Sequence, residues 1–82
     1  MRKFAIEVAS YNKTQQVGSN CNAITFINPI GSGADFTVND VPVTQGSELE
    51  ISGWQNEIDT TLYVVSFGTG TGICIVVKKV YQ

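Results

Sequence analysis

The chain has 82 residues, a net charge of −2, two cysteines and no histidine. This length predicts one domain, residues 1–82. The lack of histidine excludes Ser-His and Cys-His nucleophile pairs and a zinc site of ordinary composition. The small negative charge gives no overall attraction to nucleic acid or to an anionic membrane.

Residues 3–9 (KFAIEVA) are the first predicted element. Apolar and other residues alternate, so that Phe4, Ile6 and Val8 lie on one side of an extended chain. This pattern is typical of a half-buried strand.

Residues 10–22 are polar and show no helical periodicity. We expect a long loop here, and a further edge strand at residues 14–17 is the alternative. Residues 23–28 (AITFIN) form the next predicted strand, which ends before Pro29.

Residues 34–54 are predicted to form a strand, a turn, a short strand, a second turn and a strand. Asn39-Asp40 favours a chain reversal, because both residue types tolerate positive φ. Pro42 lacks an amide hydrogen and therefore indicates an edge strand. Gly46 suits the positive-φ position of the second turn, and residues 48–52 alternate strictly as a strand.

This central stretch resembles small β-sandwich modules of phage virion proteins of the capsid, decoration and fibre type. The resemblance rests on three pieces of sequence: Thr37-Val38-Asn39, Pro42-Val43 and Gly46-Ser47. Asp40 stands where the modules commonly have glycine, and Thr44-Gln45 where they commonly have a second proline. The resemblance implies a structural role in a virus particle, and it assigns no site residues.

Residues 54–60 are polar and contain one candidate ligand loop. Trp54, Gln55 and Asn56 combine an aromatic ring with amide groups, as a carbohydrate site requires. The alternative is that Trp54 closes one end of the sandwich.

Residues 61–67 (TLYVVSF) and 72–80 (GICIVVKKV) are the most apolar segments, and each carries apolar side chains on both faces. This predicts central strands that are covered on two sides. One cover is the opposite sheet, and the other is a second subunit or residues 10–22. The candidate interface residues are Tyr63, Val65 and Phe67.

Glycines alternate along residues 68–72 (GTGTG) between these two strands. A phosphate-binding loop would need a helix after it, whereas a strand-forming sequence follows. We therefore predict a hairpin loop.

Cys21 and Cys74 are predicted to be free thiols, and one disulfide between them is the alternative. Glu48 and Glu50 share the solvent side of a strand, where a charge aids solubility, and not the apolar pocket that a catalytic carboxyl requires. Glu57, Asp59 and Asp40 could share a calcium ion only if their loops converge. The sequence therefore predicts no catalytic residue, no metal and no cofactor, and the chain is not expected to be an enzyme.

Four of the five basic residues lie near the ends of the sequence: Arg2, Lys3, Lys78 and Lys79. They would form a small basic patch if the first and last strands are neighbours. Such a patch could contact an acidic partner or phosphates, or it could protect a sheet edge from aggregation.

Charged residues make up only 15% of the chain, against about 25% in a typical soluble domain. A surface so poor in charge suits a protein packed against copies of itself, although an ordinary small β domain is also rich in Thr and Asn. We therefore expect an all-β sandwich or barrel of six or seven strands that serves as a structural protein of a virus particle. Its partners would be itself and other virion proteins, with no membrane and no nucleic acid.

The expected location is the virion after synthesis in a host cytoplasm, because no signal peptide or transmembrane segment is recognised. A small soluble module that binds a carbohydrate or a host protein through its loops is the alternative function.

Overall fold

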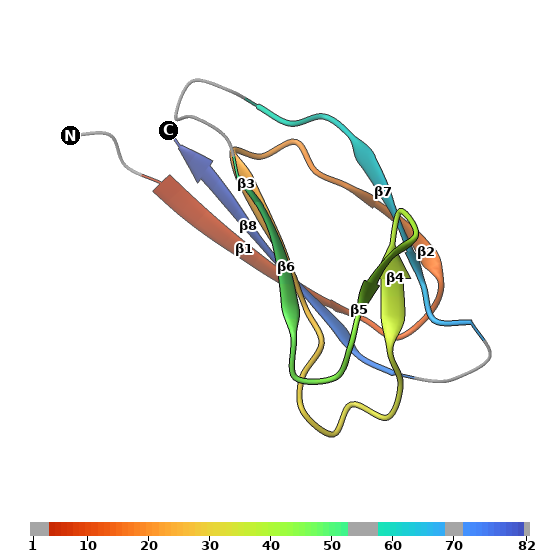
Figure 1. Ribbon diagram of the computed structural model, residues 1–82. Helices are drawn as coiled ribbons and strands as arrows, with labels where there is room; N and C mark the ends of the chain where they lie inside the picture. Colours follow the sequence, from red (N-terminus) through yellow and green to blue (C-terminus); the bar gives the residue numbers. More distant parts are fainter. Residues whose placement is uncertain (1–3, 53–57, 69–71, 82) are drawn as a thin grey trace.

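Eight β-strands make up the described part of the chain, which in this computed structural model covers residues 4–52, 58–68 and 72–81 (Figure 1). In chain order they are β1 (Phe4–Tyr11), β2 (Gln15–Gly18), β3 (Ala23–Ile27), β4 (Phe36–Val38), β5 (Val41–Val43), β6 (Glu48–Ser52), β7 (Leu62–Ser66) and β8 (Cys74–Tyr81). Sheet A has the strand order β1-β8-β3-β6, and sheet B has the order β2-β7-β4-β5. The chain is thus a small antiparallel β-sandwich, as predicted, although with eight strands instead of six or seven.

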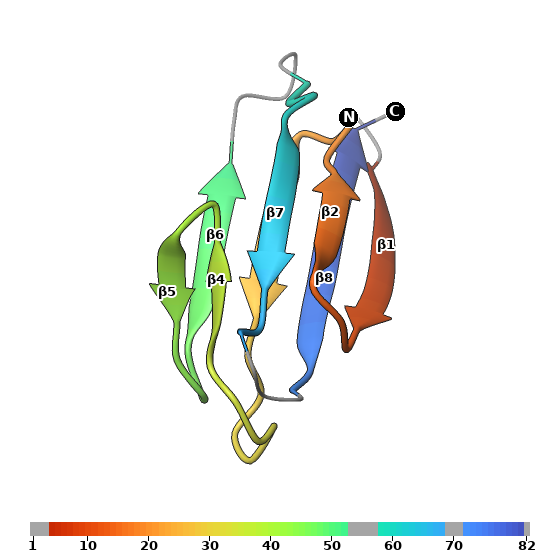
Figure 2. The same cartoon turned by 90° about the vertical axis from the view of Figure 1, so that its right-hand side faces the viewer.

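The strands pair as if one long hairpin had been folded up. β4 pairs with β5, β3 with β6, β2 with β7 and β1 with β8. We call this long hairpin of four strand pairs the folded ribbon. Two further pairings, β3 with β8 and β4 with β7, join its strands into two sheets. This is the jelly-roll topology, in which eight antiparallel strands form two packed sheets. The sheets face each other in Figure 1, and Figure 2 looks onto sheet B.

The last two strands correct one prediction. The predicted hairpin between the last two apolar segments is wrong, because β7 and β8 lie in different sheets; residues 69–71, between them, lie outside the described residues. Each is nevertheless a central strand of its own sheet, as its apolar sequence predicts. β2 confirms the alternative of an extra edge strand inside residues 10–22.

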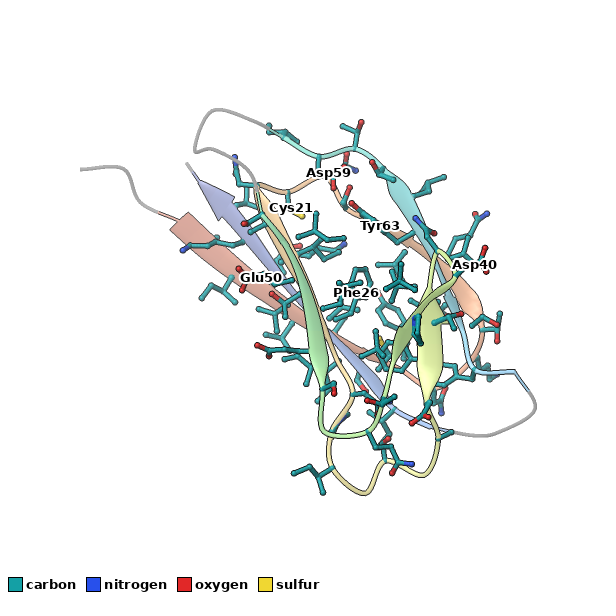
Figure 3. The ribbon with its side chains drawn as sticks, in the orientation of Figure 1. Cys21, Phe26, Asp40, Glu50, Asp59 and Tyr63 are labelled. Atoms are coloured by element: carbon teal, nitrogen blue, oxygen red, sulfur yellow. The ribbon has the colours of Figure 1, made fainter. Side chains whose placement is uncertain are left out.

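The core lies between the sheets and is filled by alternate residues of the strands. Its buried apolar side chains are Val17, Cys21, Ile24, Phe26, Phe36, Val38, Val43, Tyr63, Val65, Phe67, Cys74 and Val76. Aromatic rings from opposite sheets meet edge to face: the ring centroids of Phe26 and Tyr63 lie 5.5 Å apart, and the ring planes are inclined at 64°. Figure 3 shows both rings in the space between the sheets.

The β4–β5 hairpin turns at Asn39-Asp40, as predicted. Both residues have positive φ, 47° and 70°, as a two-residue type I′ turn requires. The Asn39 side chain also serves the sheet, because its Oδ1 accepts a hydrogen bond of 2.8 Å from the amide of Val64 on β7. The same side chain thus fixes the turn and continues the β4–β7 pairing.

The following turn and the edge strand also agree with the sequence. Gly46 has a φ of 84°, and the Ser47 amide donates to the Thr44 carbonyl at 3.0 Å. Pro42 lies in β5, which is the outermost strand of sheet B. The missing amide hydrogen of proline therefore costs the sheet no hydrogen bond.

Polar side chains hold the connections that cross between the sheets. The Phe67 amide, after β7, donates to Thr14 Oγ1 in the β1–β2 connection at 3.1 Å. The Ser19 hydroxyl, after β2, contacts the carbonyl oxygens of Asp59 and Thr61 before β7 at 2.6 and 2.8 Å. In each case one side chain ties together two connections that are far apart in sequence but lie side by side in the folded ribbon.

Asn28 holds the third such pair, between the β3–β4 and β5–β6 connections. Its Nδ2 donates to the carbonyl oxygens of Ala34 at 3.0 Å and Val43 at 2.9 Å, while its Oδ1 accepts from the Ser32 hydroxyl. The residue is fully buried, and its backbone carbonyl accepts a bond of 2.7 Å from the Gly46 amide. A buried amide with all these partners is stabilising, whereas the loss of the side chain would remove a donor from the buried Val43 carbonyl; the Ala34 carbonyl also has the Ser32 hydroxyl at 3.2 Å.

Asn28→Ala is expected to destabilise the fold by about 1–3 kcal/mol, because the buried carbonyl of Val43 loses its side-chain donor, at roughly 1–3 kcal/mol for such a group. Urea unfolding followed by tryptophan fluorescence measures this change. Asn12→Ala, at an exposed loop position, is the matched control and should stay within about 0.5 kcal/mol of wild type. Equal effects of the two substitutions would contradict this account of Asn28.

Candidate protein-interaction surface

The predicted interface residues Tyr63, Val65 and Phe67 are not on the surface. Their side chains are buried inside this single chain, with exposed fractions of 7%, 0% and 6%. The prediction of a subunit interface at these residues is therefore wrong. β7 is apolar on both faces, so its sequence did not show which face would turn inward; the outer face instead carries Leu62 and Val64, which are 60% and 41% exposed.

The second predicted site lies outside the described residues. Trp54, Gln55 and Asn56 fall in the segment 53–57, between β6 and the bridge that pairs Cys21 with Asp59.

The outer face of sheet A carries the largest set of outward-facing aliphatic side chains. Its five aliphatic residues are Ile6, Val8, Ile27, Ile75 and Val77, and we call this set the aliphatic face. The register places them side by side, since Val8 on β1 is opposite Val77 on β8, and Ile75 on β8 is opposite Ile27 on β3. The residues that alternate with them on β3 and β8, including Phe26 and Val76, point into the core.

Exposure is greatest at the β1 side of this face. Ile6 is 57% exposed and Val8 is 66% exposed, which corrects the expectation that the apolar side of β1 is buried. At the opposite margin, β6 places Glu48 and Glu50 in the same rows as Ile27 and Thr25. Figure 3 shows Glu50 on the outer side of sheet A. The face therefore changes from aliphatic to acidic across four strands.

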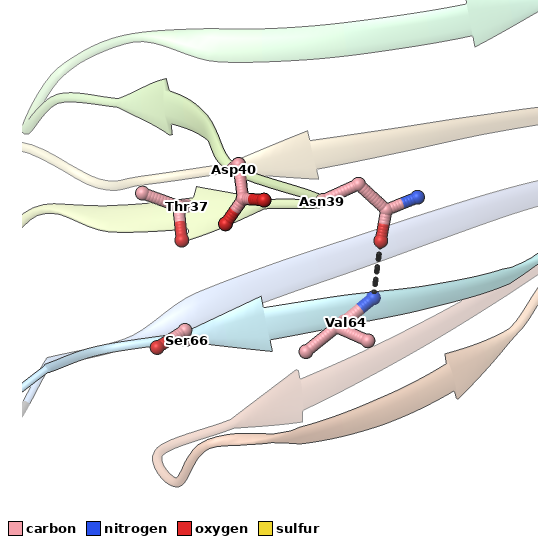
Figure 4. A pocket seen from close by; sticks show the side chains of 5 residues that line it. All are labelled: Thr37, Asn39, Asp40, Val64 and Ser66. Atoms are coloured by element: carbon pink, nitrogen blue, oxygen red, sulfur yellow. Dashed lines mark hydrogen bonds between the residues drawn. The ribbon is translucent and has the colours of Figure 1, made fainter.

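The outer face of sheet B has a different character. A shallow depression of about 390 Å³ is lined by Thr37, Asn39, Asp40, Val64 and Ser66. Figure 4 shows these side chains and the hydrogen bond from Val64 to Asn39. Hydroxyl, amide and carboxylate groups around one valine are groups that hydrogen-bond a polyhydroxylated ligand.

β1 and β8 are neighbours along their whole length, as the proposed basic patch requires. Lys78 and Lys79 are consecutive, so they point to opposite faces of sheet A. Lys78 lies opposite Glu7 on the inner side, where both line a cleft with Tyr11. Arg2 and Lys3 lie outside the described residues.

Asp59 lies at the crossing between β6 and β7 and receives several hydrogen bonds. The Thr61 amide donates to its Oδ1 at 2.9 Å, and the Tyr63 phenol donates to the other carboxylate oxygen. Hydrogen bonds from the Thr61 side chain, then from the Tyr63 phenol and the Thr61 amide, lower the pKa of Asp59. Burial, followed by the bond to Asp59, raises the pKa of Tyr63. This cluster joins β7 to the chain before it.

Cys21 and Cys74 are both free and fully buried, as the sequence predicts. Desolvation by burial raises the pKa of the Cys74 thiol to about 11, and burial likewise raises the pKa of Cys21. A thiol is nucleophilic only as the thiolate, so both behave as small apolar core residues.

Within residues 4–52, 58–68 and 72–81, no group of three or more Cys, Asp or Glu side chains comes together to hold a metal ion. The same residues contain no helix of the length and apolarity needed to cross a membrane. No protein-family model matches the chain, and comparisons with curated proteins and with solved structures found no match.

The two thiols should resist a disulfide-exchange reagent such as DTNB at pH 8 while the protein is folded. Both side chains are buried and their pKa values are raised, so little accessible thiolate is present. We expect two thiols per chain to react after unfolding in guanidinium chloride and fewer than about 0.2 per chain to react rapidly before it. Rapid reaction of either cysteine in the native protein would contradict its burial.

Asp59 should make part of the folding stability depend on acidic pH. Because its pKa is lower in the folded state, its stabilisation is present above the ordinary value of 3.8 and is lost as the pH falls through the folded-state pKa. Asp59→Asn should therefore be less stable than wild type at pH 6, with a difference that shrinks towards pH 2. Urea unfolding at a series of pH values measures it.

Tyr63→Phe is the companion variant for this measurement. It keeps the ring against Phe26 and removes one donor to Asp59, while the bonds from Thr61 remain. We expect it to retain part of the acid dependence. A constant difference between wild type and Asp59→Asn from pH 6 to pH 2 would contradict the role given to this carboxylate.

Proposed function

We propose that this chain is a non-enzymatic structural component of a virus particle, of the capsid-decoration, minor-capsid or fibre type. It acts by association with copies of itself and by docking on a protein lattice. The residues that do this are those of the aliphatic face.

The fold supports this proposal by analogy. Jelly-roll sandwiches are recurrent in viral capsid proteins, and they also occur in lectins and cupins. Because one fold serves several functions, the topology alone does not choose among them. The resemblance of residues 36–47 to phage virion modules adds weight to the capsid alternative.

The aliphatic face is the observation that carries the proposal. A small domain gains stability by burying apolar side chains, yet Ile6 and Val8 remain more than half exposed next to Val77. Contiguous apolar side chains on a sheet face, bordered by charges such as Glu50, are typical of a protein-interaction surface. Burial of a valine or isoleucine side chain is worth about 1.5–3 kcal/mol, so a few such contacts suffice for specific docking.

A second candidate function is carbohydrate binding on the outer face of sheet B. The depression lined by Thr37, Asn39, Asp40, Val64 and Ser66 favours it, because it offers hydrogen-bonding groups at one place. Asp40→Gly, which suits the positive φ of this turn position, would then abolish binding on a glycan array while leaving the thermal unfolding temperature within a few degrees of wild type. Absence of any glycan binding by the wild-type chain would count against this candidate.

The proposed function is tested by looking for the chain in virus particles. Mass spectrometry of particles purified by density gradient from cells that make the chain should detect it at a fixed stoichiometry. Ile75→Thr combined with Val77→Thr should lower its affinity for particles by at least about tenfold, because roughly 1 kcal/mol of apolar contact is lost at each site. Val64→Thr, on the outer face of sheet B, is the matched control. Recovery of the wild-type chain only outside the particles would contradict the proposal.

A further inference from the structure

The four margins of the two sheets differ in how well they are protected against pairing with another chain. β5 contains Pro42, β2 has only four residues, and β6 directs Glu48 and Glu50 outward. Short edges, proline and charge are the devices by which proteins block edge-to-edge association. β1 is eight residues long and contains no proline, and Figure 2 shows it at the margin of the molecule.

The hydrogen bonds of sheet A show which backbone groups of β1 point outward. The Asn28 amide donates to the Ser47 carbonyl at 2.9 Å, in register with the β3–β6 pairing, so even-numbered residues of β3 face β6. Because successive residues of a strand face opposite neighbours, odd-numbered residues of β3 face β8. Val77 lies opposite Thr25, so odd-numbered residues of β8 face β3 and even-numbered residues of β8 face β1. Even-numbered residues of β8 lie opposite odd-numbered residues of β1, so the odd-numbered residues of β1 face β8. The amide and carbonyl groups of Ile6, Val8 and Ser10 therefore point to the free margin.

These are also the residues whose side chains lie on the outer face of sheet A. The margin thus presents alternate amide and carbonyl groups together with the exposed side chains of Ile6 and Val8. Within the described residues no strand lies beyond β1. Outward-pointing backbone groups beside exposed aliphatic side chains make this margin a template for pairing with a strand of another chain.

We propose that two copies of this chain associate edge to edge through β1, in antiparallel orientation about a two-fold axis at Val8. An antiparallel edge is self-complementary, because each copy offers the same outward groups in the reverse order. The two A sheets then form one continuous eight-stranded sheet, and the aliphatic faces of the two copies become contiguous. This inference rests on the proposed function and specifies which surface mediates its self-association.

Glu7 disfavours one register of this pairing. Outward groups of β1 pair when the two-fold axis lies at any residue near the middle of the strand, and the registers centred on residues 7 and 8 differ in where they place Glu7. An axis at residue 7 places Glu7 directly opposite Glu7 of the second copy, where like charges repel. An axis at Val8 pairs Glu7 with Ala9 of the second copy, and Ile6 with Ser10. The second register avoids the repulsion and joins the outward groups of Ile6, Val8 and Ser10 in hydrogen bonds.

Val8→Pro tests this arrangement directly. Proline removes the amide hydrogen of Val8, which points away from β8 and is not needed within the chain, so an edge position should accept it. Sedimentation velocity should show a concentration-dependent dimer for wild type and a monomer for Val8→Pro. Val8→Thr keeps the amide and the branched side chain, and it should still form the dimer.

Hydrogen exchange followed by NMR gives a second, residue-specific measurement. In the wild-type dimer the amides of Ile6, Val8 and Ser10 should exchange at least about tenfold more slowly than at concentrations where the chain is monomeric. The amides of Glu7 and Ala9, which face β8, should be protected in both states and also in Val8→Pro. If Val8→Pro fails to fold, Val8→Lys serves instead, because it places two like charges at the axis and should also give a monomer.

Three outcomes would overturn edge pairing: a wild-type chain that stays monomeric to millimolar concentration, a dimer whose Ile6, Val8 and Ser10 amides exchange freely, or a Val8→Pro chain that dimerises like wild type. A dimer weakened by Ile75→Thr with Val77→Thr but not by Val8→Pro would show that the partner binds the face and not the edge. The same experiments separate failure of edge pairing from failure of the proposed function. A chain that is found in particles but stays monomeric contradicts only edge pairing. A chain that forms the edge dimer but is absent from particles contradicts only the proposed function.

Discussion

The topology of this protein depends on polar side chains that hold together connections distant in sequence. Where the chain passes from one sheet to the other, two connections run side by side, and polar side chains add to the backbone hydrogen bonds between their described residues. Thr14, Ser19 and Asn28 supply hydrogen bonds at the three crossings. Ser19 and Asn28 are buried, and no buried side-chain nitrogen or oxygen in the described residues lacks a partner. Since an unpaired buried group costs about 1–3 kcal/mol, these bonds favour the jelly roll over other ways of pairing the same strands.

Once the crossings are fixed, the inner face of every strand is fixed as well. A shift of one residue would move each core side chain to the surface, because the side-chain period of a strand is two. This matters most for β7 and β8, which are apolar on both faces. On β7 the crossing at Ser19 and Asp59 turns Tyr63 and Val65 inward and leaves Leu62 outside. The exposed aliphatic surface of the molecule is therefore a consequence of where the ribbon folds.

The sequence predicts local features well and long-range ones poorly. Asn39-Asp40, Pro42 and Gly46 each favour a particular backbone geometry, and the structure has that geometry at all three places. The partner of a strand depends on the crossings, which a single polar residue such as Asn28 determines through contacts with residues far along the chain. Nothing in the local pattern around Asn28 distinguishes it from the many other Asn residues. The prediction of Tyr63 at an interface fails for a different reason: β7 is apolar on both faces, so its sequence does not show which face turns inward.

The exposed side chains and the unprotected margin coincide on one strand. β1 carries the two most exposed residues of the aliphatic face, Ile6 and Val8, and the same residues direct their backbone groups outward. A chain of about 80 residues buries only about 60–65% of its unfolded surface, so it has little stability to spare. Leaving two large aliphatic side chains in water forgoes stabilisation that association would recover, at about 25 cal/mol for each Å² of apolar surface removed from water. The other margins carry proline, charge or short strands, so of the four margins β1 is the one that the proposed edge pairing would use.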